Sequence, residues 1–159
     1  MPAPTSADHS KKIIIGSDHG GFELKEQLKQ QLQKLGYEVE DVGTFSTESV
    51  DYPDFAHVVA QKVAQATDLR GIIVDGAGVG SSIAANKVPG VRAAACQDVY
   101  TARNSRAHNN ANVLTLGSRV LGPDVATDIV TVWLNTEFEG GRHANRVDKI
   151  MDIDRKYRI

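Results

Sequence analysis

Two glycine-rich segments constrain the fold of this chain most strongly. Residues 16–21 read Gly-Ser-Asp-His-Gly-Gly and residues 75–81 read Asp-Gly-Ala-Gly-Val-Gly-Ser, and each segment follows β-branched residues and precedes a helix-like stretch. A parallel strand that enters a helix through glycines exposes backbone N–H groups and the positive end of the helix dipole. Asp18, His19 and Asp75 add proton-transfer groups to these turns. We therefore expect an anion site, with phosphorylated small molecules as the leading class of ligand.

The hydrophobic pattern alternates between strand-like and helix-like periods along the chain. Strands are expected at 13–15, 37–42, 72–74, 91–96 and 113–116, and helices at 22–35, 83–87, 98–107 and 123–134. A further helix through residues 58–63 is expected to follow a turn at 51–54. This order predicts a doubly wound α/β fold of five parallel strands, in which ligands bind beyond the carboxyl ends of the strands. We expect one domain over residues 12–159, preceded by a disordered tail over residues 1–11.

Charge and composition exclude several classes of partner. The 159 residues include 18 basic and 20 acidic side chains, a net charge of −2, which argues against a nucleic-acid partner. No apolar run approaches the roughly 20 residues that span a bilayer, and the first ten residues do not resemble a signal peptide. The single cysteine, Cys96, excludes an intramolecular disulfide and is expected to be a core residue. The sequence predicts a cytoplasmic protein without a membrane or nucleic-acid partner.

The glycine turns alone do not identify a ligand. Gly76, Gly78 and Gly80 lack the spacing of a dinucleotide-binding fingerprint, and no Gly-Lys-Ser/Thr completes a nucleotide P-loop. Glycines at such positions often serve only a tight turn. Arginines in or beside further glycine turns favour a phosphate ligand, because a guanidinium binds phosphate in a bidentate manner, although each one is also compatible with a solvated surface charge. They are Arg119, Arg142 and Arg146.

The motifs, taken in order, resemble the type B ribose-5-phosphate isomerases and their galactose-6-phosphate isomerase relatives. They lie at 16–22, 51–53, 78–80, 84–87, 108–113, 117–119 and 139–146. The resemblance implies a three-layer α/β/α sandwich with a five-stranded Rossmann-like sheet in the order 2-1-3-5-4. It also implies a homodimer or homotetramer whose pockets combine residues of two subunits, and an aldose–ketose isomerisation that needs no metal and no cofactor.

The resemblance also implies a role for each site residue. Asp18 and His19 would contact the sugar, Tyr52 would line the pocket, and His108 would open the sugar ring. Asn109 would position the sugar oxygens, and the three arginines named above would hold the phosphate. The loop backbone would hold the enediolate as an oxyanion site. That loop comprises Gly76, Ala77, Gly78, Val79, Gly80 and Ser81.

The chain departs from the family pattern at the residue that would act as the catalytic base. One branch of the family has a cysteine in place of Asp75, and another has a glutamate in place of Ser81; a threonine common in the cysteine branch is Ala77 here. A partly desolvated Asp75 could remove the substrate proton. The same carboxylate could instead accept backbone N–H groups and only fix the loop. We expect a sugar-phosphate isomerase with a pentose 5-phosphate as first choice; the alternatives are a tetrose or hexose phosphate, or a sugar-phosphate-binding subunit without catalysis.

Overall fold

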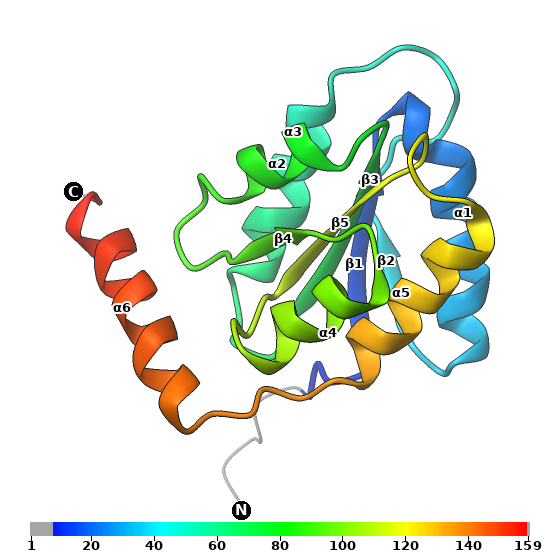
Figure 1. The fold of residues 1–159 in the computed structure, drawn as a ribbon. Coiled ribbons are helices and arrows are strands. Elements are labelled where there is room, and N and C mark those ends of the chain that lie inside the picture. Colours follow the sequence, from blue (N-terminus) through cyan, green and yellow to red (C-terminus); the bar gives the residue numbers. More distant parts are fainter. Residues whose placement is uncertain (1–7, 159) are drawn as a thin grey trace, which may run out of the picture.

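The computed structural model describes residues 8–158 and contains a five-stranded parallel sheet in the order β2-β1-β3-β5-β4 (Figure 1). The strands are β1 (Lys12–Ser17), β2 (Glu38–Asp41), β3 (Arg70–Asp75), β4 (Ala93–Ala95) and β5 (Val113–Gly117). Register places Ile15 opposite Ile72, so β1 and β3 are neighbours and end at the same edge. The predicted fold class and strand order are confirmed.

Helices cover both faces of the sheet (Figure 1). The helices of the chain are α1 (Phe22–Lys34), α2 (Tyr52–Val63), α3 (Val79–Ala85), α4 (Val99–Ala107), α5 (Pro123–Asn135) and α6 (Arg142–Lys156), and a 3₁₀ turn, η1 (His19–Gly21), precedes α1. Buried side chains of α1, α4 and α5 pack on one face, and those of α2 and α3 pack on the other. These two helical layers and the sheet form the predicted three-layer sandwich.

The side-chain alternation of β1 shows how the sequence specifies this sandwich. Ile13 and Ile15 pack with α1 and α5, whereas Ile14 packs with α2 on the opposite face. All three isoleucines are buried, as expected for a central strand of a parallel sheet. Each such side chain contributes roughly 1.5–3 kcal/mol by burial, so β1 anchors both layers.

Three element predictions need correction. The helix expected at 83–87 begins at Val79 instead, because Gly78 adopts a positive φ of 77° and forms the helix N-cap directly after the turn. The strand expected at 91–96 is only Ala93–Ala95. Helix α6 was not predicted, since no strand follows it and only His143 and Val147 of its side chains are buried.

The amino-terminal segment is described only in part. Residues 1–7 of the expected disordered tail lie outside the described residues, so that prediction and the boundary at residue 12 stay untested. His9, just before β1, contacts Asp68 through its backbone N at 3.0 Å and its Nδ1 at 2.8 Å. Between residues 8 and 158, no helix is long and apolar enough to cross a membrane.

Candidate active site

The turns after β1, β3 and β5 meet beyond the carboxyl ends of these strands. The Asp18 N–H donates to Val74 O at 3.2 Å, and the Arg119 N–H donates to Gly76 O at 3.0 Å. Ser118 Oγ donates to Gly20 O at 2.7 Å and joins the first turn to the last. We call the predicted site residues at this end of the strands the strand-end cluster, which comprises Asp18, His19, Tyr52, residues 75–81 and Arg119.

Asp75 organises the loop between β3 and α3. Its Oδ1 accepts the Gly78 N–H, and its Oδ2 accepts the Ser81 N–H at 3.1 Å and the Ser81 hydroxyl at 2.6 Å. The Asp75 residue is only 4% exposed. A Cβ added to Gly117 would lie 2.6 Å from the backbone carbon of Ala77, so the loop packs directly on the end of β5. The carboxylate therefore shapes the loop, as the alternative interpretation predicted, and the same atoms lie at the floor of the cluster.

Two backbone donors of this loop stay available to a ligand. The N–H groups of Gly76 and Ala77 have no hydrogen-bond acceptor within residues 8–158. Ala77 is exposed, and the Arg119 side chain passes beside Gly76, where an added Cβ would lie 3.9 Å from Nε. Adjacent N–H donors and a guanidinium form a suitable environment for an oxyanion or a phosphate group.

The remaining residues of the strand-end cluster form its wall. Asp18 Oδ1 accepts the Gly21 N–H at 3.0 Å. The His19 ring contacts the Val50 backbone through Nδ1, at 3.1 Å from N and 3.2 Å from O, which leaves its Nε2 for a ligand. Tyr52 covers Gly80 so closely that an added Cβ would lie 2.5 Å from its ring. The cluster therefore presents a carboxylate, an imidazole and a phenol around the loop.

The other predicted site residues lie at the opposite end of the strands, where the strands begin. His108 is the C-cap of α4, which runs back from the end of β4, and Arg142 begins α6 after a loop whose Glu139 N–H donates to Ala107 O at 3.0 Å. Figure 1 shows this end of α4 and the start of α6 at the edge where the strands begin. We call His108, Asn109, Arg142 and Arg146 the helix-end cluster. A single chain does not bring the two clusters together.

His108 stacks on His143, a residue to which the sequence analysis assigned no role. The ring centroids are 3.9 Å apart with an interplanar angle of 11°. The two Nε2 atoms lie 3.7 and 3.6 Å from Glu139 Oε1. Partial burial, followed by the charges of His108 and Arg142, lowers the pKa of His143. The four-residue spacing of Glu139 and His143 within an arginine-rich motif was the available signal for this pair.

The same three side chains form the only group of potential metal ligands found within residues 8–158. Imidazole lone pairs lie in the plane of the ring, so two nearly parallel stacked rings do not point at one ion. Glu139 Oε1 instead lies at ion-pair distance from both rings, beyond the range of a hydrogen bond.

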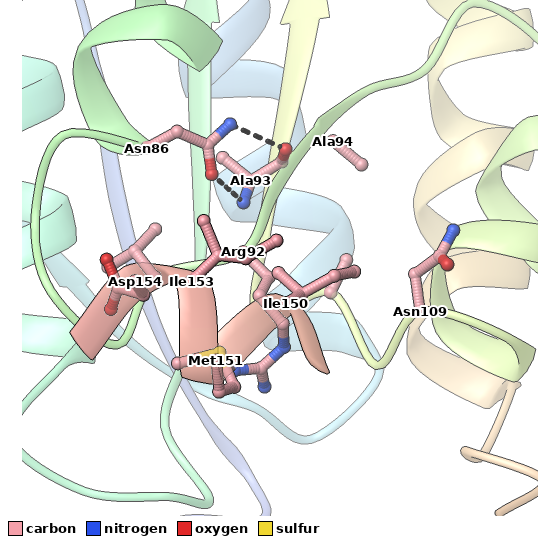
Figure 2. A pocket seen from close by; sticks show the side chains of 11 residues that line it. Asn86, Arg92, Ala93, Ala94, Asn109, Ile150, Met151, Ile153 and Asp154 are labelled. Atoms are coloured by element: carbon pink, nitrogen blue, oxygen red, sulfur yellow. Dashed lines mark hydrogen bonds between the residues drawn. The ribbon is translucent and has the colours of Figure 1, made fainter. Parts of the chain in front are cut away.

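A cavity of about 410 Å³ separates α6 from the edge strand β4 and is drawn in Figure 2. Ile150, Met151 and Ile153 line it from α6, and the Asn86 side chain holds the Ala93 backbone through bonds of 2.8 and 3.0 Å. Asn109 is the predicted site residue that reaches this cavity. The α6 side of the lining is thus mainly apolar, and the donor side chains that also line the cavity, Asn86, Arg92 and Asn109, each make hydrogen bonds to other residues of the chain.

Cys96 lies outside both clusters. It is 1% exposed, packs in the core between the sheet and α4, and its pKa is raised, chiefly by burial. A buried thiol with a raised pKa is neither a nucleophile nor a base at neutral pH.

Comparisons with known proteins agree with this site. The family model for Ribose/Galactose Isomerase matches residues 13–150. The structure of ribose-5-phosphate isomerase B from Clostridium thermocellum is 58% identical, with a TM-score of 0.88, and the match covers 92% of this chain and 99% of that one. Ribose-5-phosphate isomerase B of Escherichia coli is 49% identical over 92% of this chain and 98% of its own length. D-erythrulose-4-phosphate isomerase of Pectobacterium atrosepticum is 44% identical, and the match covers 87% of this chain and 91% of that protein.

These matches confirm the predicted resemblance and the predicted enzyme class, an aldose–ketose isomerase. They cover nearly all of the described residues and include both clusters. The chain belongs to the ribose/galactose isomerase family.

Proposed function

We propose that this chain interconverts ribose 5-phosphate and ribulose 5-phosphate through an enediolate. The single observation that carries the proposal is the strand-end loop, where the buried Asp75 carboxylate lies beside the unpartnered N–H groups of Gly76 and Ala77. A base and adjacent oxyanion donors are the two elements that proton transfer next to a carbonyl requires. The E. coli and C. thermocellum relatives, both ribose-5-phosphate isomerases, support the choice of a pentose.

Asp75 is the proposed base. It would take the proton from C2 of the open-chain sugar and return it to C1, while the loop N–H groups stabilise the negative charge that develops on the oxygen. The hydroxyl proton of O2 would pass to O1 in the enediolate, which completes the change from aldose to ketose. Ser81 would orient the carboxylate through its 2.6 Å hydrogen bond to Oδ2. Oδ1 accepts one bond in the described structure, from Gly78, and a carboxylate oxygen has room for a second. This role is compatible with the loop-shaping contacts because a carboxylate offers more acceptor positions than the loop occupies.

A homo-oligomer would complete the site. The proposed ring-opening group, His108, and two of the three phosphate ligands, Arg142 and Arg146, lie at the edge opposite Asp75. The exposed Ile150 and Ile153 of α6, which stands apart from the sheet in Figure 1, are suited to contact with a second copy. In a homodimer or homotetramer, the helix-end cluster of one chain would then close over the strand-end cluster of its neighbour.

A tetrose phosphate is the second candidate substrate. The relative from P. atrosepticum, which is 44% identical, is a D-erythrulose-4-phosphate isomerase. A shorter sugar would leave the same base, oxyanion donors and phosphate ligands in use. A cytoplasmic location remains a prediction for either substrate.

Two assays test the proposed function. Purified protein is incubated with four-, five- and six-carbon aldose and ketose phosphates, and isomerisation is followed by NMR in D₂O, which also reports exchange of the C2 hydrogen. We expect the highest kcat/KM with ribose 5-phosphate. A higher kcat/KM with erythrose 4-phosphate would establish the second candidate. Thermal protection by sugar phosphates without isomerisation or exchange would show a binding subunit instead and contradict the proposal.

A further inference from the structure

Three arginine side chains converge at the edge where β3, β4 and β5 begin. Arg70 opens β3, Arg92 directly precedes β4, and Arg106 lies in the last turn of α4. All three line one cavity of about 260 Å³, and Asn110 and Asn112 line it with them. No residue of the helix-end cluster lines this cavity, so it is a separate feature of the same edge.

The guanidinium groups are held by neutral acceptors. Arg106 Nη1 donates to Ala111 O at 2.7 Å and to Asn110 Oδ1 at 3.0 Å, and Arg92 Nε donates to Asn110 O at 3.0 Å. Arg70 Nη1 has a single long bond of 3.5 Å, to Leu134 O. Within residues 8–158, the Nη2 group of each arginine has no hydrogen-bond partner. Arg92 and Arg106 are therefore fixed in place, Arg70 is held only weakly, and part of the donor capacity of all three stays free.

Their charges are only partly offset by the described residues. No carboxylate of residues 8–158 forms an ion pair with any of the three arginines. Burial, followed by the charges of Arg70 and Arg92, lowers the pKa of Arg106 to about 10. Asp68 and Glu137 also line the cavity, and the Asp68 carboxylate is paired with His9 at 2.8 Å. The lining thus has an excess of positive charge at a partly buried place, where an anion would stabilise it.

We propose that this cavity binds a small phosphate-class oxyanion, distinct from the phosphate of the substrate. Guanidinium groups hold phosphate oxygens in bidentate fashion, and the cavity volume suits a free ion or a small phosphorylated molecule. Arg92 and Arg106 both hold Asn110, which lies directly after His108 and Asn109. The bound anion would therefore stabilise the segment that carries the proposed ring-opening residue.

Inorganic phosphate titration by calorimetry tests this site, in a background that lacks two of the three proposed substrate phosphate ligands. The background is the Arg142→Gln/Arg146→Gln variant of the full chain, whose two substituted side chains are exposed. We expect it to bind one phosphate per chain at the arginine cavity. Trp133, the only tryptophan in the chain, lies under Arg70 and Arg106 at 5.6 and 5.9 Å from its ring centroid, so its fluorescence should change on binding.

The matched variants are Arg70→Gln and Lys34→Gln, each added to this background. The Arg70 side chain makes only one weak hydrogen bond, so its replacement should preserve the fold, and Lys34 is an exposed cation on α1 whose loss changes the net charge equally. Arg70→Gln should weaken phosphate binding by about tenfold or more, and Lys34→Gln should leave it unchanged. Absence of binding in the background variant, or equal loss with both substitutions, would overturn the proposal. An assembled protein in which a partner chain fills the cavity, so that no phosphate binds there, would also overturn the proposal.

Discussion

The strand-end cluster is fixed by hydrogen bonds within one chain, whereas the helix-end cluster projects side chains from helix termini. Asp75 is 4% exposed and binds the backbone of its own loop, but the His108 side chain is 39% exposed and Arg142 and Arg146 are exposed. Oxyanion stabilisation depends on donors that are already oriented before the reaction. The side chains proposed for ring opening and for most of the phosphate binding lie instead at the other end of the strands. This comparison suggests that one chain supplies the strand-end cluster as a rigid floor of the site. A second chain would supply the helix-end cluster, which we call the cover.

The largest expected effect comes from removing the base from the rigid floor. Asp75→Asn keeps the size of the side chain but removes its capacity to accept a proton near neutral pH. Exchange of the C2 hydrogen with solvent should fall by about 10²–10⁴-fold, because general-base catalysis contributes a factor of this size. NMR in D₂O measures the exchange.

Two controls distinguish catalysis from loop shaping. Ser81→Ala removes the 2.6 Å bond to Oδ2 but keeps the carboxylate, so it should reduce exchange much less than Asp75→Asn. Calorimetry of sugar-phosphate binding should show an unchanged affinity in Asp75→Asn. Exchange at the wild-type rate in Asp75→Asn would show that the aspartate only shapes the loop.

A mixing experiment tests whether the floor and the cover come from different chains. Asp75→Asn and His108→Asn should each be nearly inactive as a homo-oligomer. After unfolding and refolding as an equal mixture, half of the dimers are hetero-dimers, and each has one site with both residues intact. About a quarter of the wild-type activity should therefore return. No recovery, although mixed oligomers are detected by mass spectrometry, would mean that each site is built from a single chain.

The phosphate ligands of the cover should give a smaller effect. Arg142→Ala or Arg146→Ala removes a charge-assisted contact of roughly 1.5–3 kcal/mol, which corresponds to a loss of about tenfold or more in sugar-phosphate affinity. The melting temperature should change little because both side chains are exposed. Calorimetric titration measures the affinity, and Lys34→Ala on α1 is the control for loss of one positive charge. Unchanged affinity in both arginine variants would place the phosphate elsewhere.

The smallest expected effect is a pH dependence of stability at the stacked histidines. Partial burial and neighbouring positive charges lower the pKa of His143 below its ordinary value of 6.5. The unfolded chain then binds this proton more readily, so the stability that the neutral ring contributes should be present above pH 6.5 and decrease as pH falls below it. Urea unfolding between pH 7.5 and pH 5 should show a shallower decrease in His143→Gln than in wild type. Equal slopes of the free energy of unfolding against pH in the two proteins would contradict the assignment of this pH dependence to His143.

Much of the strand-end cluster could be predicted from the sequence. Asp18, the loop at 75–81 and Arg119 each follow a β-branched strand, and parallel strands end at a common edge, so their convergence follows from the pattern. The role of Asp75 as a loop acceptor was one of two alternatives, and its hydrogen bonds were needed to see it.

The features that were missed depend on contacts between elements distant in the sequence. Helix α6 is followed by no strand, so the alternation of elements does not predict it, although the helical spacing of Val147, Ile150 and Met151 was an available signal. The cavity at Arg70, Arg92 and Arg106 combines a strand, a loop and a helix end, and no local motif joins them. His143 became notable only because its ring stacks on His108.

The burial of Cys96 has a consequence for how the enzyme tolerates oxidants. Thiolates react with peroxides and electrophiles, and a catalytic cysteine is inactivated when it is oxidised beyond the sulfenic acid. Here the single thiol of the chain is enclosed in the core with a raised pKa, and an aspartate occupies the position that is cysteine in one branch of the family. Peroxide or iodoacetamide at concentrations that inactivate a cysteine-dependent isomerase would find no reactive thiol here, so the activity of this enzyme should survive such treatment.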